Sequence, residues 1–155
     1  MTVPQNDDGR KMSEEMRFDI QEEMSVPMQR DQELAVADRA AELARSAGFD
    51  TDRIDEIRIA LIEAVINAIE HGNNPEKLVH VTFRLDIKAK RIEICVADRG
   101  GGFNPGRVET PDIHKKMVKG SRKRGWGLTL MRGLMDEVSI RTSEQGSCVV
   151  LVKKG

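Results

Sequence analysis

Aromatic residues and net charge are both scarce in this chain. Its 155 residues include no Tyr, one Trp and four Phe, so the aromatic platforms on which single-stranded nucleic acids stack are few. Its 25 Lys and Arg residues nearly balance its 26 Asp and Glu residues, which leaves a net charge of −1. No global charge therefore favours a nucleic acid or a membrane surface. We expect neither as a direct partner.

Long apolar segments are missing as well. No apolar run approaches the roughly 18 residues that a membrane-spanning helix needs, and residues 1–15 lack the apolar centre of a secretory signal. That polar start is expected to be a disordered tail, followed by one domain over residues 16–155. We expect a cytoplasmic protein.

Cysteine is limited to Cys95 and Cys148. Each lies in an apolar strand pattern, without a CxxC partner or a His at metal-ligand spacing. We expect both to be reduced core residues, which agrees with a reducing compartment.

Apolar periodicity and turn residues predict a grouped order of elements. The expected order is a strand over 16–26, helices over 32–46 and about 51–71, strands over about 78–87 and 91–97, a helix over about 127–136, and strands over 138–142 and 148–152. This order favours an antiparallel or mixed sheet with helices on one face. Residues 104–124 are too long for a passive connection, and we expect a lid, a binding segment or plain disorder.

Two polar residues stand out in the otherwise apolar second helix. Glu63 and Asn67 lie one turn apart, and with Glu70 they fall within about 60° of one another around the helix axis. A buried acid and amide cost free energy unless partners compensate. An Asn oxygen is a suitable ligand for Mg²⁺, and a Glu one turn earlier could accept a proton. The alternative is an ordinary solvent-facing stripe.

Two glycine segments follow apolar elements. The first is Asp98-Arg99-Gly100-Gly101-Gly102-Phe103, where a strand-end carboxylate could accept from adenine N6 and the glycines admit a flat ring; a plain Asp/Gly turn is the alternative. The second is Gly125-Trp126-Gly127-Leu128, where free N–H groups at a helix start could bind phosphate. A basic run precedes the second segment: Lys115, Lys116, Lys119, Arg122, Lys123 and Arg124.

Together the three segments resemble the N box and the two glycine boxes of the GHKL ATPase superfamily. The N box is Glu63-Ala64-Val65-Ile66-Asn67-Ala68-Ile69-Glu70-His71-Gly72. Over residues 20–153 the chain is similar to the small bacterial anti-sigma factor serine kinases. This resemblance implies an α+β Bergerat fold: a two-layer sandwich with a mixed, mostly antiparallel sheet, helices on one face, and ATP beneath a mobile lid.

The resemblance also implies a role for each matching residue. Glu63 corresponds to the general base, and Asn67 to the Mg²⁺ ligand. The positions that correspond to nucleotide contacts are Asp98 at adenine, Gly100, Gly102, Gly125, Gly127, Leu128, and Ser147, where the family commonly has Thr. In the first helix, Ala37 stands where these kinases often carry an Arg directed at phosphate, and Arg39 is two positions away, about 200° around the helix.

Two functions follow as hypotheses. The first is an anti-sigma factor that also uses ATP and Mg²⁺ to phosphorylate a serine of a STAS-type antagonist, with a sigma factor as its second partner and a homodimer as its assembly. The alternative is an ATP-gated binding module without kinase activity. The N box favours the kinase, and the unmatched first-helix Arg favours the module.

Overall fold

The computed structural model describes residues 18–72, 76–98, 123–143 and 146–155. The expected tail (residues 1–15) lies outside the described residues, as do Gly100, Gly102 and most of the expected lid (residues 104–124). No described helix combines the length and the apolar character that a bilayer span requires.

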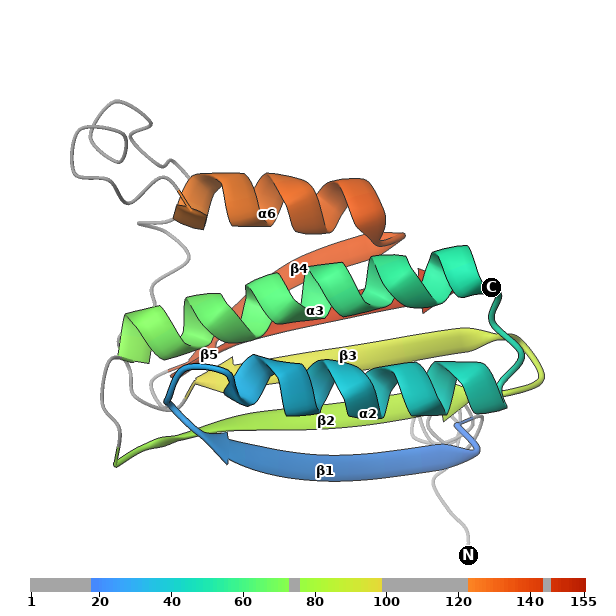
Figure 1. Ribbon diagram of the computed structural model, residues 1–155, viewed down its shortest axis with the longest axis horizontal. Helices are drawn as coiled ribbons and strands as arrows, with labels where there is room; N and C mark the ends of the chain where they lie inside the picture. The colour runs from blue at the N-terminus through green and yellow to red at the C-terminus, as the bar shows by residue number, and fades with distance from the viewer. Residues whose placement is uncertain (1–17, 73–75, 99–122, 144–145) are drawn as a thin grey trace, which may run out of the picture.

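The described elements form two layers, a five-stranded sheet with helices on one of its faces (Figure 1). The chain runs β1 (Ile20–Pro27), α2 (Gln32–Ser46), α3 (Thr51–Gly72), β2 (Leu78–Asp86), β3 (Arg91–Asp98), α6 (Lys123–Leu134), β4 (Glu137–Ser143) and β5 (Gly146–Lys154). The strand order is β1-β2-β3-β5-β4. Each neighbouring pair is antiparallel. The expected α+β class is therefore confirmed. The sheet was expected to be mixed and mostly antiparallel, and all of its described strand pairs are antiparallel.

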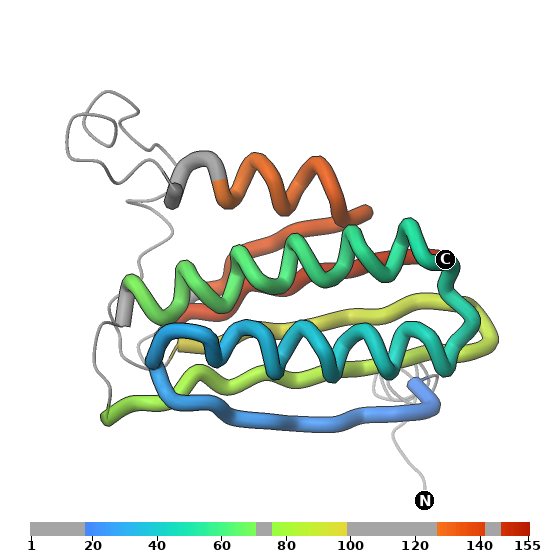
Figure 2. The backbone as a smooth tube through the Cα atoms, in the orientation of Figure 1, coloured from blue at the N-terminus to red at the C-terminus, as the bar shows by residue number. Residues whose placement is uncertain are grey.

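The two long helices begin and end where their sequence signals indicate. The Asp50 side chain accepts a hydrogen bond from the backbone N–H of Arg53 (2.8 Å), which caps the start of α3. This hydrogen bond lowers the pKa of Asp50 below its usual value. Gly48 ends the α2 segment with φ 87°, a left-handed conformation that glycine adopts without strain. Figure 2 shows α3 returning beside α2 on the same face of the sheet.

Small residues let these helices lie close to each other and to the sheet. α2 packs on β1 and β2, whereas α3 packs on β3 and β5 and contacts α6. Buried alanines recur on the inner faces of both helices. On α2 and α3 they are Ala37, Ala40, Ala41, Ala44, Ala60, Ala64 and Ala68. The strands supply the larger apolar side chains, including Phe83, Leu85, Ile92, Ile94 and Leu151.

The expectation of two reduced core cysteines is wrong. Cys95 of β3 and Cys148 of β5 form a disulfide, with their Cα atoms 6.2 Å apart. The strand pattern was correct, but it showed neither that β5 lies directly beside β3 nor which face of the sheet the cysteines occupy. Alternation along β3 puts Ile94 and Val96 in the core. Half-buried Cys95 therefore lies on the face away from the helices.

Candidate functional site

The predicted acid–amide pair lies on α3 where the helix is otherwise packed in the core. Leu61, Ala64 and Val65 are buried around it. Glu63 Oε2 and Asn67 Oδ1 each expose less than 1 Å². Among the described residues, Asn67 Oδ1 has no hydrogen-bond partner. A buried acceptor in that state costs about 1–3 kcal/mol, so a ligand that coordinates this oxygen would recover free energy.

Gly127 of α6 is the residue that closes against this pair. A Cβ atom at this position would lie 2.7 Å from Glu63 Oε2 and 3.1 Å from Asn67 Nδ2. Both distances are shorter than ordinary van der Waals contact. The absence of a side chain at residue 127 therefore lets α6 approach α3 at the N box.

The expectation that Gly127 opens its helix is wrong. α6 begins at Lys123, so Gly127 is its fifth residue. An N–H group at the fifth position is normally bonded to the carbonyl four residues earlier, and only the first turn has free N–H groups. The role of Gly127 is close packing, and Gly125 lies in the first turn instead. Leu128 is partly buried and packs against the core.

The predicted adenine residues meet on the sheet. Asp98 ends β3, Ser147 is the second residue of β5, and the two are direct partners in the antiparallel register. Both are buried, with exposed fractions of 4% and 5%. Figure 1 shows that the end of β3, the start of β5, the C-terminal end of α3 and the N-terminal end of α6 lie at the same end of the molecule. Gly127 lies against Glu63 and Asn67, and Asp98 pairs with Ser147 on strands that end and begin at this end of the molecule.

The sequence interpretation missed Lys153, which anchors α6 at its other end. Lys153 of β5 is 7% exposed. Its Nζ atom forms an ion pair with Glu56 Oε1 of α3 (2.8 Å) and donates to the carbonyl oxygen of Leu134. A cation at a helix C-terminus satisfies free carbonyl groups and the helix dipole. Alternation from Leu151 along β5 was the available signal, because it places residue 153 on the helix side.

Arg39 does not replace the missing first-helix Arg. Ala37 is fully buried. The Arg39 guanidinium donates to both carboxylate oxygens of Glu22, from Nε (2.5 Å) and Nη2 (2.6 Å), and to Glu42 from Nη1 (2.8 Å). This pairing lowers the pKa of Glu22 and raises that of Arg39. The Arg39 cation is thereby committed to β1 and to its own helix.

The donor set fits a metal ion that brings most of its own ligands. Among the described residues, no group of three or more His, Cys, Asp or Glu side chains could hold a metal. Asn67 supplies one buried amide oxygen. Mg²⁺ commonly binds through one or two protein oxygens together with substrate phosphates and water, so the residues present fit Mg²⁺ that arrives with a nucleotide.

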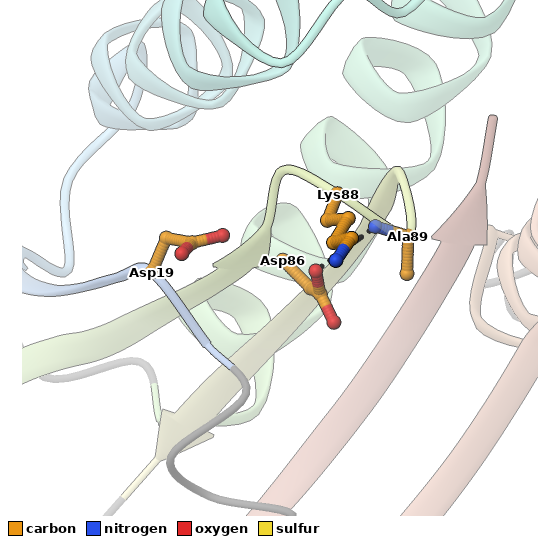
Figure 3. Close-up of a pocket in the computed structure, with 4 residues that line it drawn as sticks. All are labelled: Asp19, Asp86, Lys88 and Ala89. Atoms are coloured by element: carbon orange, nitrogen blue, oxygen red, sulfur yellow. Dashed lines mark hydrogen bonds between the residues drawn. The ribbon is translucent and has the colours of Figure 1, made fainter.

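A separate cavity lies at the β2–β3 turn. Its volume is about 310 Å³. Figure 3 shows its lining residues Asp19, Asp86, Lys88 and Ala89. Asp19 accepts from the backbone N–H of Ile87 (2.8 Å), and Asp86 accepts from that of Ala89 (2.9 Å). These carboxylates serve the turn, and none of the predicted site residues that the structure describes lines this cavity.

Comparison with known proteins matches most of the chain to one family. A family model described as a histidine kinase-like ATPase domain matches residues 26–153. The chain is similar to serine-protein kinase RsbW of Bacillus velezensis and of Bacillus subtilis, with 31% identity over 134 residues in each case, which covers 84% of this chain and 83% of each relative. It is 32% identical over 114 residues to serine-protein kinase RsbW of Oceanobacillus iheyensis, which covers 72% of each protein.

The fold is also similar to a solved structure. A crystal structure of the RsbU and RsbW domains of a Mycobacterium tuberculosis protein matches with a TM-score of 0.62 at 20% identity. The match covers 86% of this chain and 32% of that one. This likeness supports the layered arrangement of helices on an antiparallel sheet.

Proposed function

This chain belongs to the RsbW family of serine-protein kinases, within the histidine kinase-like ATPase domains, and from that premise we propose that it binds ATP and transfers the γ-phosphoryl group to a serine of a STAS-domain partner. In the same proposal it is a cytoplasmic anti-sigma factor that assembles as a homodimer. The STAS partner and the sigma factor are its two alternative ligands.

The observation that carries this proposal is the contact between α6 and the N box. Gly127 has no room for a Cβ atom beside Glu63 Oε2 and Asn67 Nδ2. Two predicted motifs, about sixty residues apart in sequence, therefore form one surface. A helix that merely completed the core would not need a glycine against two polar side chains.

Each polar group has a distinct part in the proposal. Asn67 would hold Mg²⁺ through Oδ1, which is buried and has no hydrogen-bond partner among the described residues. Mg²⁺ bound with ATP would neutralise charge that develops on the phosphates. Glu63 would accept the proton of the acceptor serine hydroxyl as it attacks. The base acts only in the transition state, whereas the metal ligand acts already in the bound ground state.

The adenine end of the site would belong to the sheet. Asp98 would accept a hydrogen bond from the exocyclic amine of adenine, and the Ser147 hydroxyl lies on the neighbouring strand at the same register position. Their burial favours this role because a hydrogen bond to a charged group in a dry pocket is stronger than one in water.

One observation favours the second candidate, an ATP-gated binding module. Kinase activity needs positive charge around the γ-phosphate. Ala37 offers none, and Arg39 is engaged by Glu22 and Glu42. The basic run at residues 115–124 is another source of cations in the sequence.

The test is transfer of ³²P from γ-labelled ATP to the serine of a co-encoded STAS-domain protein. We expect label transfer by the native chain and none by Glu63→Gln, which keeps the size of the side chain and removes the base. Asn67→Ala should instead remove the Mg²⁺-dependent part of ATP affinity, measured by calorimetry. ATP-dependent association with the partner but no label transfer would favour the binding module.

A further inference from the structure

The disulfide lies on the two strands that carry the proposed adenine residues. Cys148 directly follows Ser147 in β5, and Cys95 precedes Asp98 by three residues in β3. In the β3–β5 register, Asp98 pairs with Ser147 and Ala97 pairs with Cys148. The Cys148 end of the covalent link is therefore one register step from the Asp98–Ser147 pair, and the Cys95 end is three steps from it.

The link also encloses much of the proposed site. Cys95 and Cys148 are separated by 53 residues, and this stretch of chain includes Asp98, all of α6 with Gly127, and Ser147. A crosslink restricts the relative motion of the segments that it joins. Fixing β3 against β5 thus fixes the spacing of the two adenine residues before any ligand binds.

The disulfide lies outside the core that the helices cover. Cys95 and Cys148 are half-buried and lie on the sheet face opposite the helices. Arg141 of β4 is the direct register partner of Cys148. The strand beside this half of the disulfide therefore carries a cationic residue at the same register position.

We propose that Cys95–Cys148 is a reversible redox clasp that tunes nucleotide affinity: the oxidised form holds Asp98 and Ser147 in the spacing that binds adenine, and the reduced form binds ATP more weakly. The inference rests on the proposed function for its ligand. Disulfides in reducing compartments are mostly transient or sensing, which agrees with the cytoplasmic location proposed above.

The chemistry is thiol–disulfide exchange with a protein or small-molecule dithiol. A thiolate of the dithiol attacks Cys95 Sγ, a mixed disulfide forms, and Cys148 leaves as a thiolate that takes up a proton. The second thiol of the reductant then attacks the mixed disulfide and releases Cys95. Two electrons and two protons pass to the protein, and the dithiol becomes a cyclic disulfide.

The affinity experiment compares oxidised and dithiothreitol-reduced full-length protein by calorimetry with Mg·ATP. We expect about tenfold tighter binding by the oxidised form, within the usual range of coupling between two sites. The Cys95→Ser/Cys148→Ser double variant should bind like the reduced protein in either buffer, which controls for direct effects of the reductant. Equal affinities of the oxidised and reduced native protein would overturn the proposal.

Two further measurements do not depend on kinase activity. By linkage, saturating Mg·ATP should make the disulfide harder to reduce by the same factor, measured as the thiol fraction at equilibrium with dithiothreitol. Without nucleotide, reduction should speed amide hydrogen exchange at residues 96–98 and 147–149 in the native protein but not in the double variant. Amide hydrogen exchange that does not change on reduction would overturn the proposal.

These measurements separate the two proposals. If neither redox form binds ATP, the proposed function fails. The amide hydrogen-exchange data then decide by themselves whether the disulfide holds β3 and β5 in place. Peptide mapping of air-oxidised protein without reductant should recover residues 95 and 148 in one crosslinked fragment. Recovery of two free thiols there would overturn the inference directly.

Discussion

The two halves of the candidate site are held together in different ways. On the helix side, α6 meets α3 through a missing side chain at Gly127 and through Lys153, which joins Glu56 and the end of α6. On the sheet side, β3 and β5 are joined by a full antiparallel register and by a disulfide. Side-chain shape thus positions the residues proposed to act at the phosphates. Backbone pairing and a covalent bond position the residues proposed to bind adenine.

This difference predicts how each half responds to change. A packing contact fails locally when one side chain grows, because only the touching atoms must move. A crosslink acts mainly on the unfolded chain and so changes the stability of the whole domain. We therefore expect large global effects from the sheet side and large local effects on activity from the helix side.

The largest expected change in stability comes from removing the disulfide. For a loop closed over a separation of 53 residues, the chain-entropy relation gives about 4 kcal/mol. We expect Cys95→Ser/Cys148→Ser to lower the free energy of unfolding in urea by about that amount. Dithiothreitol should lower the stability of the native protein equally and leave the variant unchanged. A native protein whose urea midpoint ignores reductant would contradict this account of the sheet side.

A single methyl group at residue 127 should disrupt the contact between α6 and α3. In Gly127→Ala the new Cβ atom would come within 2.7 Å of Glu63 Oε2, so the carboxylate at the flexible end of Glu63 must move. Displacing a reacting group by about 1 Å can lower a rate about 100-fold. We expect that loss in phosphoryl transfer, with a change in stability of only about 1 kcal/mol, because Ala also favours the helix.

Gly133→Ala is the matched control for Gly127→Ala. Gly133 lies in the same helix, and a Cβ atom there would meet nothing within 4 Å. Stability should rise by about 0.5–1 kcal/mol from helix propensity alone, with transfer unchanged. If both variants lost activity alike, flexibility of α6 rather than its contact with Glu63 would be the cause.

Local chemistry made one part of the molecule predictable from sequence. Glu63 and Asn67 were identified because polar residues are rare on the buried faces of a helix, and α2 was predicted with its observed bounds. The strand order was not predictable in this way: β5 pairs with β3 across a long separation, and the disulfide follows from that pairing. Gly127 was misplaced because low helix propensity suggested a helix start, although packing against α3 and the core keeps the helix there. Lys153 was missed because a lysine in a strand usually faces solvent.

The smallest expected effect lies away from both halves, at the ion pair between Glu22 and Arg39. Arg39 lowers the pKa of Glu22 in the folded protein, so the pair stabilises the fold above the unfolded Glu pKa of about 4.3. That contribution is lost as the pH falls through the lower, folded pKa. The two side chains are 31% and 39% exposed, so we expect Glu22→Gln to cost only about 0.5 kcal/mol at pH 7. The difference from the native protein should vanish once the pH is below the folded pKa of Glu22, as measured by urea unfolding across pH. Glu23→Gln makes the same charge change at an exposed neighbouring position and serves as the matched control at pH 7. Because Arg39 is committed to β1, saturating Mg·ATP should leave the Glu22→Gln difference unchanged, and a difference that grew with nucleotide would assign Arg39 to the phosphate site after all.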